Sequence, residues 1–404
     1  MLNYVRNLLL YVVFHKPVVL VTGAIVLTTI GVFASVGTSI LIGRRRASRA
    51  HTTGDARLAM VLLLFCLGDW GLLWALPHLR LSFSRHIGLA LAASLGIRLA
   101  VFWGLMLARM LTRWRSRQRG VEIEARSAAI MFAVVNLAFG IVQVDAYVVE
   151  PLLVETTELS FTSEKLDPTA PPVRVMHLTD LHIERTSYRE AAIVRKVNAL
   201  QPDIIVITGD HLNTSYISDP TAAADLRELF AQLRAPYGIY AVRGTVEPTE
   251  ASMAWLVEGT DVVWLEQESI TLDVRGQHVT LVGAACSHRL STDVPRLDRA
   301  LVGIPRETFT LLLYHSPDLI HEAADRGIDL YVAGHTHGGQ LRLPFYGALF
   351  TSSIYGKQYE AGLFEEDGMT MIISRGIGFE GGPMPRARFL CRPEIVSIEL
   401  RGDR

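Results

Sequence analysis

The sequence predicts two parts: a bundle of about four transmembrane helices at residues 1–150 and an α/β domain at residues 173–404, joined by a linker at residues 151–172. Half of the 404 residues are hydrophobic, which is high for a water-soluble chain. Residues 1–150 hold 16 Lys and Arg against 6 Asp and Glu, a net charge of +10, which leaves −11 for the remainder. After residue 172, short apolar runs alternate with amphipathic stretches, a pattern typical of the α/β class.

The basic part contains four apolar stretches long enough to cross about 30 Å of hydrocarbon. They are Pro17–Gly43, Leu58–Pro77, Ile87–Leu111 and Ala128–Val149. Arginines cluster in the first and third connecting segments, so the positive-inside rule predicts that these two segments face the cytoplasm. The sequence therefore predicts a multi-pass protein of the cytoplasmic membrane, with the acidic domain on the extracytoplasmic side.

Ionisable residues also occur inside the predicted spans. Asp69 and Arg98 each lie near the middle of neighbouring antiparallel spans, and Asp145 lies near the end of the last one. Asp69 and Arg98 are expected to pair at one depth. A structural lock between helices is favoured over a proton path, because one pair does not make a relay.

The acidic part contains apolar runs of strand length that each end in polar residues. The runs are 173–178, 204–208, 238–242, 310–314 and 328–333, and helical patterns at 188–200 and 222–233 lie between some of them. Ligands of open α/β sheets bind at the carboxyl ends of the strands, so the residues that follow these runs are expected to converge. Those with metal-binding chemistry are Asp180, His182, Asp210, His315, His335 and His337.

The residue types at these strand ends indicate a metal site. Asp180 and His182 are two residues apart, so on an extended segment both side chains would point to one side. Imidazole with carboxylate suits Mn, Fe or Zn better than Ca, and six such groups exceed the need of one tetrahedral ion. Two divalent ions about 3.5–4 Å apart, sharing Asp210, would use the whole set.

These motifs resemble the calcineurin-like metallophosphoesterases, specifically their bacterial membrane-anchored branch. The resemblance covers about Val173 to Leu400 and rests chiefly on the seven-residue run Gly-His-Thr-His-Gly-Gly-Gln at 334–340. It implies a four-layer αββα sandwich and hydrolysis of phosphoester or pyrophosphate bonds. It also implies one ion held by Asp180, His182, Asp210 and His337, and a second held by Asp210, His315 and His335.

One segment departs from the family's pattern. Where the family has Gly-Asn-His followed by an acidic residue, this chain has Gly244-Thr245-Val246-Glu247. The family's Asn would be a ligand of the second ion, and its His would stabilise the phosphate or protonate the leaving group. Thr245 is expected to be a weaker metal ligand. Glu247 joins Asp180 and Asp210 in the predicted catalytic set, with His211 as another candidate, although a supporting role is the simpler interpretation of both.

Three further features are weighed in the acidic part. Arg386 and Arg388 are predicted substrate-binding residues, because guanidinium groups suit phosphate, with solvated surface arginines as the alternative. The apolar stretch Leu343–Phe350 would line an acyl-chain cleft, enter the outer leaflet or simply pack in the fold. His288 is expected to be a loop residue.

The functional prediction is a membrane-anchored two-metal phosphohydrolase that acts on a lipid or other cell-envelope phosphate and not on nucleic acid. The alternative is a degenerate esterase, a sensor or scaffold that binds a phosphate ligand without turnover. Transport is disfavoured, because four short-looped spans with one buried pair hardly form a pathway.

Overall fold

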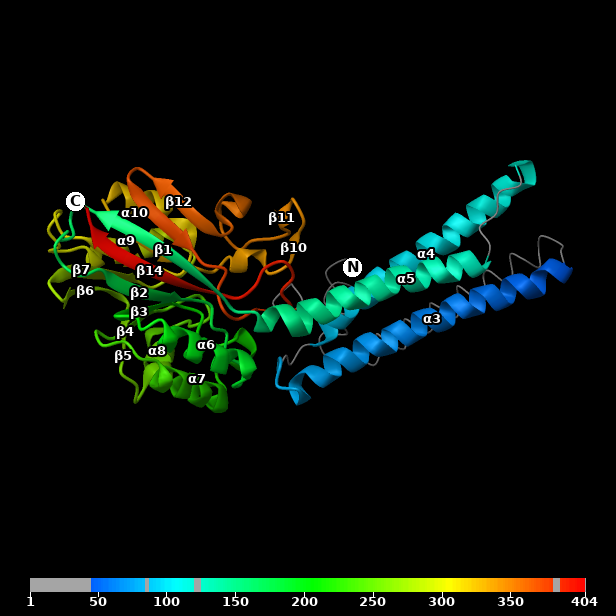
Figure 1. Cartoon of the computed structure of the whole chain (residues 1–404), viewed down its shortest axis with the longest axis horizontal. Helices are drawn as coiled ribbons and strands as arrows, with labels where there is room; N and C mark the ends of the chain where they lie inside the picture. Colours follow the sequence, from blue (N-terminus) through cyan, green and yellow to red (C-terminus); the bar gives the residue numbers. More distant parts are fainter. Residues whose placement is uncertain (1–44, 84–86, 120–124, 381–385, 404) are drawn as a thin grey trace. The chain divides into compact units, whose positions relative to one another are not determined.

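The computed structural model describes residues 45–83, 87–119, 125–380 and 386–403 (Figure 1). The chain separates into two compact units. One comprises the N-terminal helices with residues 381–386, and the other comprises residues 80–83, 146–380 and 387–404. Each unit is described by itself below.

The helical unit contains α3 (Arg45–His78), α4 (Ile87–Arg119) and α5 (Ala125–Val144). Within the described residues, three helical segments are long and apolar enough to cross a membrane: Leu58–His78, Ala90–Thr112 and Ser127–Leu152. They coincide with the second, third and fourth predicted apolar stretches and show that these are helical, while the predicted span Pro17–Gly43 lies outside the described residues. Arg45 to Arg57, expected in a loop, form the first turns of α3.

A buried polar network joins the three helices. The Arg98 guanidinium lies 2.6 Å from the Asp69 carboxylate, which confirms the predicted pair. It also donates to Asn136 and Gln143 of α5, at 2.8 and 2.7 Å from their side-chain oxygens. Ser94 donates to Asp69 and accepts from Gln143. These hydrogen bonds satisfy the buried charges, as a structural lock between helices requires.

The domain unit contains two six-stranded sheets, which confirms the predicted α/β class. The first sheet has the order β1-β14-β2-β3-β4-β5, with β2 to β5 parallel, and the second has the order β12-β13-β9-β8-β7-β6, with β13, β9, β8 and β7 parallel. The strands of the first sheet are β1 (Glu155–Ser163), β2 (Val173–Leu178), β3 (Ile204–Thr208), β4 (Ile239–Val242), β5 (Val262–Leu265) and β14 (Glu394–Gly402). Those of the second are β6 (Gln267–Val274), β7 (Gln277–Ala284), β8 (Thr310–Leu313), β9 (Leu330–Ala333), β12 (Gly362–Glu366) and β13 (Met369–Ile373).

Three apolar clusters define the layers of the domain. Side chains from both sheets, such as Val206 and Leu311, share the central cluster. The other face of the first sheet packs against α6 (Tyr188–Ala199), α7 (Pro220–Gln232) and α8 (Glu250–Val257). The other face of the second sheet packs against α9 (Leu290–Ala300) and α10 (Ile320–Asp325). The layers therefore follow the order helices, sheet, sheet, helices.

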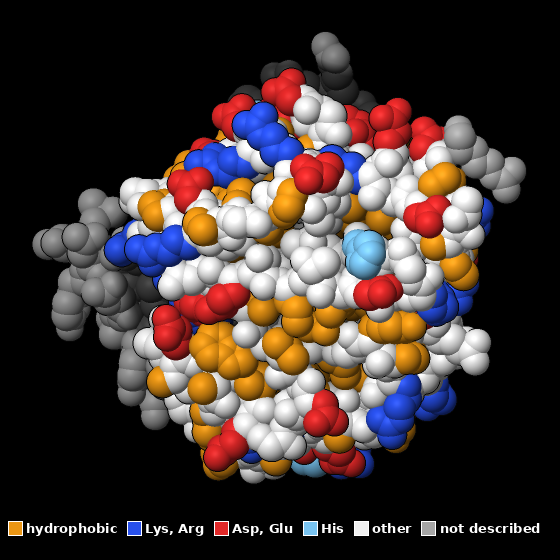
Figure 2. All heavy atoms as spheres, turned by 90° about the vertical axis from the view of Figure 1, so that its left-hand side faces the viewer, with side chains coloured by type: hydrophobic (Ala, Val, Ile, Leu, Met, Phe, Trp, Pro, Cys, Tyr) orange, Lys and Arg blue, Asp and Glu red, His pale blue; other side chains and the backbone are white. Residues whose placement is uncertain are grey.

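The predicted linker differs from what the structure contains. Residues 155–163 form the edge strand β1, which pairs in parallel with β14 from Glu155↔Glu394 to Ser163↔Gly402. The predicted linker therefore contains the end of the short η2 helix (Glu150–Leu152) and the whole of β1. Its remaining residues are short connections before β1 and between β1 and β2. Figure 2 shows one face of the molecule, where acidic and basic side chains are interspersed around a band of apolar ones.

Candidate metal centre

The carboxyl ends of strands from both sheets bring six ligand-type side chains together, as the sequence predicts. The first group is Asp180, His182 and His337, and the second is Asp210, His315 and His335. Asp180 and His182 follow β2, Asp210 follows β3, His315 follows β8, and the two remaining histidines follow β9. In each group, one ligand atom from every residue lies within 4.8 Å of the others.

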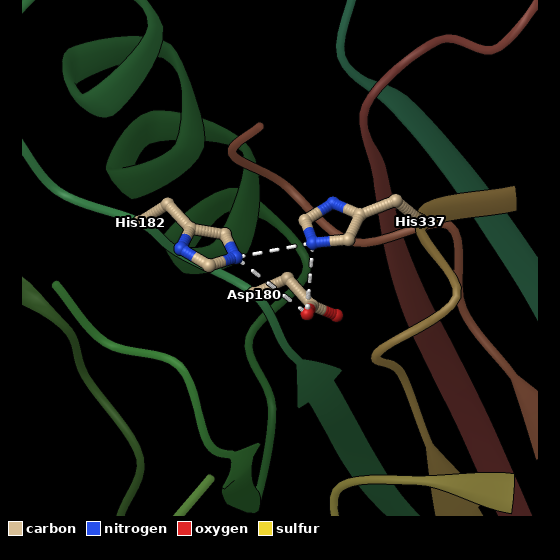
Figure 3. A group of neighbouring side chains, drawn as sticks. All are labelled: Asp180, His182 and His337. Carbon is tan, nitrogen blue, oxygen red and sulfur yellow. Dashed lines mark hydrogen bonds and ion pairs between the residues drawn. The ribbon is translucent and has the colours of Figure 1, made fainter. Parts of the chain in front are cut away.

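The first group points its ligand atoms at one location (Figure 3). Nε2 of His182 and Nε2 of His337 are 3.1 Å apart, and Asp180 Oδ1 is 3.3 Å from Nε2 of His337. Two ligands at about 2.0–2.1 Å from one tetrahedral ion would lie about 3.3 Å apart. The spacing of these atoms therefore fits one small divalent ion.

The second group repeats this arrangement and lies beside the first. Nδ1 of His335 is 3.1 Å from Nε2 of His315, and Asp210 Oδ2 is 3.2 Å from the same His315 nitrogen. Oδ2 of Asp210 is also 3.7 Å from Nε2 of His182 in the first group. One oxygen of Asp210 thus faces both groups, where the predicted bridging ligand belongs.

The backbone at the ligand residues Asp180 and His182 is not extended, although the sequence pattern predicts an extended segment there. Asp180, His182, Asp210, His335 and His337 all have positive φ, between 43° and 67°. The two i, i+2 pairs therefore converge through left-handed turns and not through extended segments. Positive φ is uncommon for residues other than glycine, and such strain persists where the surroundings enforce it, often at functional sites.

Glycines let these turns pass close to one another. A Cβ on Gly244 would lie 2.3 Å from Asp210 Oδ1, and one on Gly334 would lie 2.2 Å from Asp180 Oδ2. Gly209 has φ of 87°, and a Cβ there would lie 2.5 Å from the Gly244 Cα. The loops that carry the carboxylates can close only because these positions lack side chains.

Acceptor atoms lie near the outer ring nitrogens of two of the imidazoles. The carbonyl oxygen of Thr208 lies 2.6 Å from Nδ1 of His315 and turns Nε2 of that ring toward the centre. Oε2 of Glu380 lies 3.5 Å from Nδ1 of His182, close enough for an ion pair but without a hydrogen bond. Metal-binding histidines usually have such a partner on the second nitrogen, which sets both the tautomer and the ring orientation.

The electrostatics of the centre favour ligand forms that bind metal. Burial, together with the nearby His315, holds the pKa of His335 well below its ordinary value. Burial and the adjacent His182 do the same for the pKa of His337. Burial alone would raise the pKa of Asp210, but His315 outweighs it and holds that pKa well below the ordinary value. Two neutral imidazoles and an ionised bridging carboxylate are the states that ligate divalent ions.

The pKa values of His315 and Asp180 are both raised, because charged groups are buried here close together. Burial would lower the pKa of His315, but the Asp210 carboxylate raises it to about 10. Burial raises the pKa of Asp180, against the attraction of His315. Among the described residues, Asp180 Oδ1 has no hydrogen-bond donor although it is buried. A buried carboxylate oxygen aimed at imidazole nitrogens fits a cation between them.

Comparison with known proteins agrees with this chemistry. Residues 173–339 match the family described as calcineurin-like phosphoesterase. The uncharacterized metallophosphoesterase YkuE of Bacillus subtilis (strain 168) is 27% identical over 258 residues, which are 62% of this chain and 87% of the relative. The chain therefore carries a calcineurin-like phosphoesterase domain. The matched segment and these relatives support a metal-dependent phosphoesterase.

Two other relatives of the phosphoesterase domain bear on membrane association and substrate. A transmembrane protein with metallophosphoesterase domain from Bos taurus is 29% identical over 320 residues, 74% of this chain and 69% of the relative. The UDP-2,3-diacylglucosamine pyrophosphatase LpxG of Chlamydia trachomatis is 23% identical over 299 residues, 61% of this chain and 89% of the relative. With the three apolar helices, the first of these relatives indicates a membrane protein.

The segment that departs from the family pattern holds Asp210 through its backbone. The amide nitrogens of Thr245 and Val246 donate to Asp210 Oδ1 at 2.7 and 2.9 Å. Thr245 Oγ1 lies 3.2 and 3.3 Å from the two oxygens of the same carboxylate. Thr245 is therefore beside the second group, as predicted, and its role as a ligand stays a prediction.

Glu247 and His211 support the phosphoesterase loops from inside the domain. The fully buried Glu247 carboxylate accepts from the amides of Asp210, His211 and Gly244 at 3.2, 2.8 and 3.0 Å. Burial would raise the pKa of Glu247, but His211, 3.3 Å away, holds it below its ordinary value. Glu247 thus positions Asp210. Neither Glu247 nor His211 is in a ligand group, and the catalytic role predicted for Glu247 stays a prediction.

The two predicted substrate-binding arginines have different outcomes. Arg388 is fully buried, and its guanidinium donates to the carbonyl oxygens of Arg375, Gly376, Gly378 and Cys391. These contacts disfavour the predicted phosphate binding by Arg388, because its donors already hold the loop that packs on Asp180, and that role stays a prediction. Arg386 is also buried and is assigned to the helical unit, so its role stays a prediction.

The sequence pattern did not identify two residues that lie beside the centre, His288 and Glu380. The exposed His288, expected to be a simple loop residue, follows β7, and its ring centroid lies 4.4 Å from that of His335. The rule that strand ends carry the site residues would have included His288. Glu380 beside His182 had no such signal, because it follows no predicted strand.

Proposed function

We propose that the chain is a two-metal phosphohydrolase. In this proposal Asp180, His182, Asp210 and His337 would hold one divalent ion of Mn, Fe or Zn. Asp210, His315 and His335, with Thr245 as a weak fourth ligand, would hold the second. The observation that carries the proposal is the position of Asp210 Oδ2, 3.2 Å from His315 and 3.7 Å from His182.

The chain's own residues would divide the work as follows. Bound ions of this kind polarise a phosphoryl oxygen and lower the pKa of a water molecule. Thr245 and Val246 fix the bridging carboxylate through their amides, and Glu247 holds the two loops together. Val246 supplies no proton donor where the resemblance places the family's histidine. The chain therefore offers ligands and orientation, without the usual side-chain acid.

The missing acid bears on which bond is cleaved. A phosphate leaving group has a pKa of about 6 and departs as an anion at neutral pH. An alkoxide is far more basic and needs a proton from an acid. We therefore propose that a pyrophosphate bond or an aryl ester is cleaved in preference to an alkyl phosphoester. The relative LpxG is named for pyrophosphatase action on a diacylated sugar nucleotide, which supports a lipid-linked substrate in the cell envelope.

Metal analysis with a substrate panel tests this proposal. The full chain in detergent, supplied with Mn²⁺, is assayed on an aryl phosphomonoester, an aryl phosphodiester, a lipid pyrophosphate and an alkyl phosphodiester. His337→Ala should abolish hydrolysis and lower the metal content. His321→Ala is a matched control, because His321 is an exposed histidine paired with Glu366. A metal-loaded wild-type protein that hydrolyses none of the four compounds would overturn the proposal.

The alternative is a degenerate esterase that binds a phosphate ligand without turnover. The observation that favours it is the half-buried Val246, which offers no donor to a phosphate. This alternative expects binding of inorganic phosphate or a nucleotide to the metal-loaded chain with no product after long incubation. Any turnover lost in His337→Ala and kept in His321→Ala excludes it.

We further propose that residues 1–150 anchor the chain in the cytoplasmic membrane with the phosphoesterase domain outside. The three apolar helices and the arginine-rich segments around them support this orientation. A cysteine at exposed Thr169, where the native cysteines are buried, should react with a membrane-impermeant reagent in intact cells. A cysteine at Arg45 should not, and the reverse pattern would overturn the proposed orientation.

A further inference from the structure

An exposed apolar hairpin follows the metal ligand His337 in the domain. Its strands are β10 (Arg342–Leu343) and β11 (Gly347–Ala348), and a short turn joins them. The side chain of Phe345 at the turn is fully exposed, at 110% of its reference area. The other exposed apolar side chains of this segment, here called the apolar hairpin, are Leu343, Tyr346, Leu349 and Phe350. Contiguous apolar side chains on a surface usually mark an interaction site.

The turn holds Phe345 outward at a conformational cost. Phe345 has φ of 63°, a region that bulky side chains seldom adopt and that glycine or asparagine would enter more easily. Gly347, two residues on, has φ of 83° and shows that the same turn uses glycine elsewhere. A phenylalanine at such a position is less favourable for the turn than glycine or asparagine would be. Its exposed ring therefore points to a contact outside the domain.

The charges around the hairpin suit a lipid surface. Residues 341–359 contain no Asp or Glu, and their two basic residues are Arg342 and Lys357. Glu360, the next residue, pairs with Arg342 at 2.7 Å and accepts from the Ala348 amide at 3.1 Å, so the hairpin carries a neutral ion pair and the charge of Lys357. Lys357 Nζ lies 3.5 Å from the centroid of the Tyr346 ring, and it donates to the Tyr346 carbonyl. Tyrosine with lysine beside apolar side chains is typical of the headgroup region, where the aromatic body is buried and the charge reaches water.

Hydrogen bonds within the domain unit connect the hairpin to the end of the last candidate span. That span ends at Leu152, and its residues from Ala146 onward belong to the domain unit. The Ala146 carbonyl accepts from the amide of Arg388, and the Glu150 carboxylate accepts from the amide of Leu390 at 2.8 Å. Phe389, which lies between Arg388 and Leu390, forms a β-bridge with Leu341. The backbone amide of Arg342 donates to the Phe389 carbonyl at 3.0 Å. The exit of the span and the apolar hairpin are thus joined through one intervening segment.

We propose that the apolar hairpin inserts into the surface of the bilayer that the spans cross. The inference goes beyond the proposed hydrolysis, because it concerns a membrane contact that exists with or without turnover. Leu390, Val149 and Leu153, which lie in the segments that connect the span's end to the hairpin, are also exposed apolar residues. The hairpin begins a few residues after His337, and Cys391 Sγ donates to the His337 carbonyl at 3.1 Å. Insertion would therefore hold a ligand-bearing loop at the level of lipid headgroups.

Depth-dependent quenching tests the insertion. The full chain carrying Phe345→Cys, labelled with the fluorophore NBD, is reconstituted in vesicles of phosphatidylethanolamine and phosphatidylglycerol. Lipids with a spin label on the acyl chain should quench this probe, and aqueous iodide should not. Val302→Cys is the matched control, because Val302 is an equally apolar, 78% exposed residue after α9. Its probe should be quenched by iodide and not by the lipids. Leu349→Cys provides a second hairpin position with the same expected result.

Two outcomes would overturn the inference. One is quenching of both hairpin probes by iodide, as at Val302. The other is a pair of results: lipid quenching disappears when the protein-to-lipid ratio is lowered, and unlabelled Phe345→Cys chains form disulfide crosslinks with one another. Together these would show that the hairpin contacts a second copy of the chain and not the bilayer. As an activity readout, Phe345→Asp with Phe350→Asp should slow hydrolysis of a bilayer substrate at least 10-fold and leave a soluble aryl phosphate unaffected. Failure of the wild type on every substrate would refute the proposed function, while the quenching result would still decide the insertion.

Discussion

Restoring the family's Asn-His pair is the sharpest perturbation of the centre. The Thr245 amide is 2.7 Å from Asp210 Oδ1, so a side chain at position 245 starts beside the second ligand group. Thr245→Asn offers a carbonyl oxygen one bond further out than the threonine hydroxyl. Val246→His places an imidazole at a half-buried position that solvent reaches, so the ring needs no cavity.

The expected magnitude follows from the chemistry of a positioned acid. A general acid contributes about 10²–10⁴-fold to a rate. We expect about 10²-fold from the double replacement, or about 2.7 kcal/mol of activation free energy, since each tenfold is about 1.36 kcal/mol. The gain should be largest for alkyl phosphoesters, whose leaving group needs the proton most. Metal content should rise towards two ions per chain, because the second group gains a ligand.

The assay combines elemental analysis with initial rates in Mn²⁺ on aryl and alkyl substrates. Thr245→Asn with Val246→Phe is the control, since phenylalanine matches the size of the ring and lacks its nitrogen atoms. The reasoning is refuted if the Asn-His variant changes neither metal content nor rate while His337→Ala abolishes wild-type activity. In that case another group already supplies the proton.

Three other perturbations test separate parts of the argument. Asp210→Ala should remove both ions and His315→Ala mainly the second, as measured by metal per chain, and equal losses in the two variants would contradict a bridging Asp210. Gly244→Ala should lower the free energy of unfolding of the metal-free domain by about 1–3 kcal/mol, measured by denaturant unfolding. The reason is that the added Cβ would lie 2.4 Å from the Asp210 amide nitrogen. An unchanged unfolding midpoint would show that the loops can accommodate the methyl group. Arg375 lowers the pKa of Glu394 against the effect of burial, so this carboxylate stabilises the fold above its unfolded pKa of about 4.3 and loses that effect as pH falls through its lower folded value. Glu394→Gln should therefore lower Tm at pH 7, with the difference from wild type shrinking below about pH 4, and a constant difference would exclude the linkage.

The strands and ligands could be predicted because their signals are local. Apolar runs predicted at 173–178 and 204–208 coincide with β2 and β3, and the polar residues after them reach the centre. The conformation that brings Asp180 and His182 together was not predictable in the same way. Their positive φ values depend on close packing with Gly376 and Gly378, nearly 200 residues away, whose positions would collide with Asp180 or His182 if they carried a Cβ.

Long-range partners explain the other differences. Strand β1 looks like a polar linker, because its hydrogen-bond partner β14 is more than 200 residues distant and covers only one of its edges. Arg388 follows a segment rich in glycine and proline that suggests a solvent-exposed loop. Its burial depends on a cage of carbonyl oxygens from 375–378 that forms only in the folded domain. A sequence pattern reports which residues carry chemistry, whereas these contacts depend on tertiary packing.

The structure separates two roles that the Gly-Asn-His pattern combines. The backbone of residues 244–247 still performs the scaffolding: two amides bind Asp210, Gly244 leaves room for its carboxylate, and Glu247 ties both loops. Only the side-chain functions at Thr245 and Val246 are changed. A chain that had merely lost its centre would have no physical need to keep six buried ligand groups, five of them on strained backbone, around unneutralised charge. Cations in the centre would offset the cost of that arrangement. We therefore expect this architecture to bind metal and expect the leaving group or solvent to supply the proton.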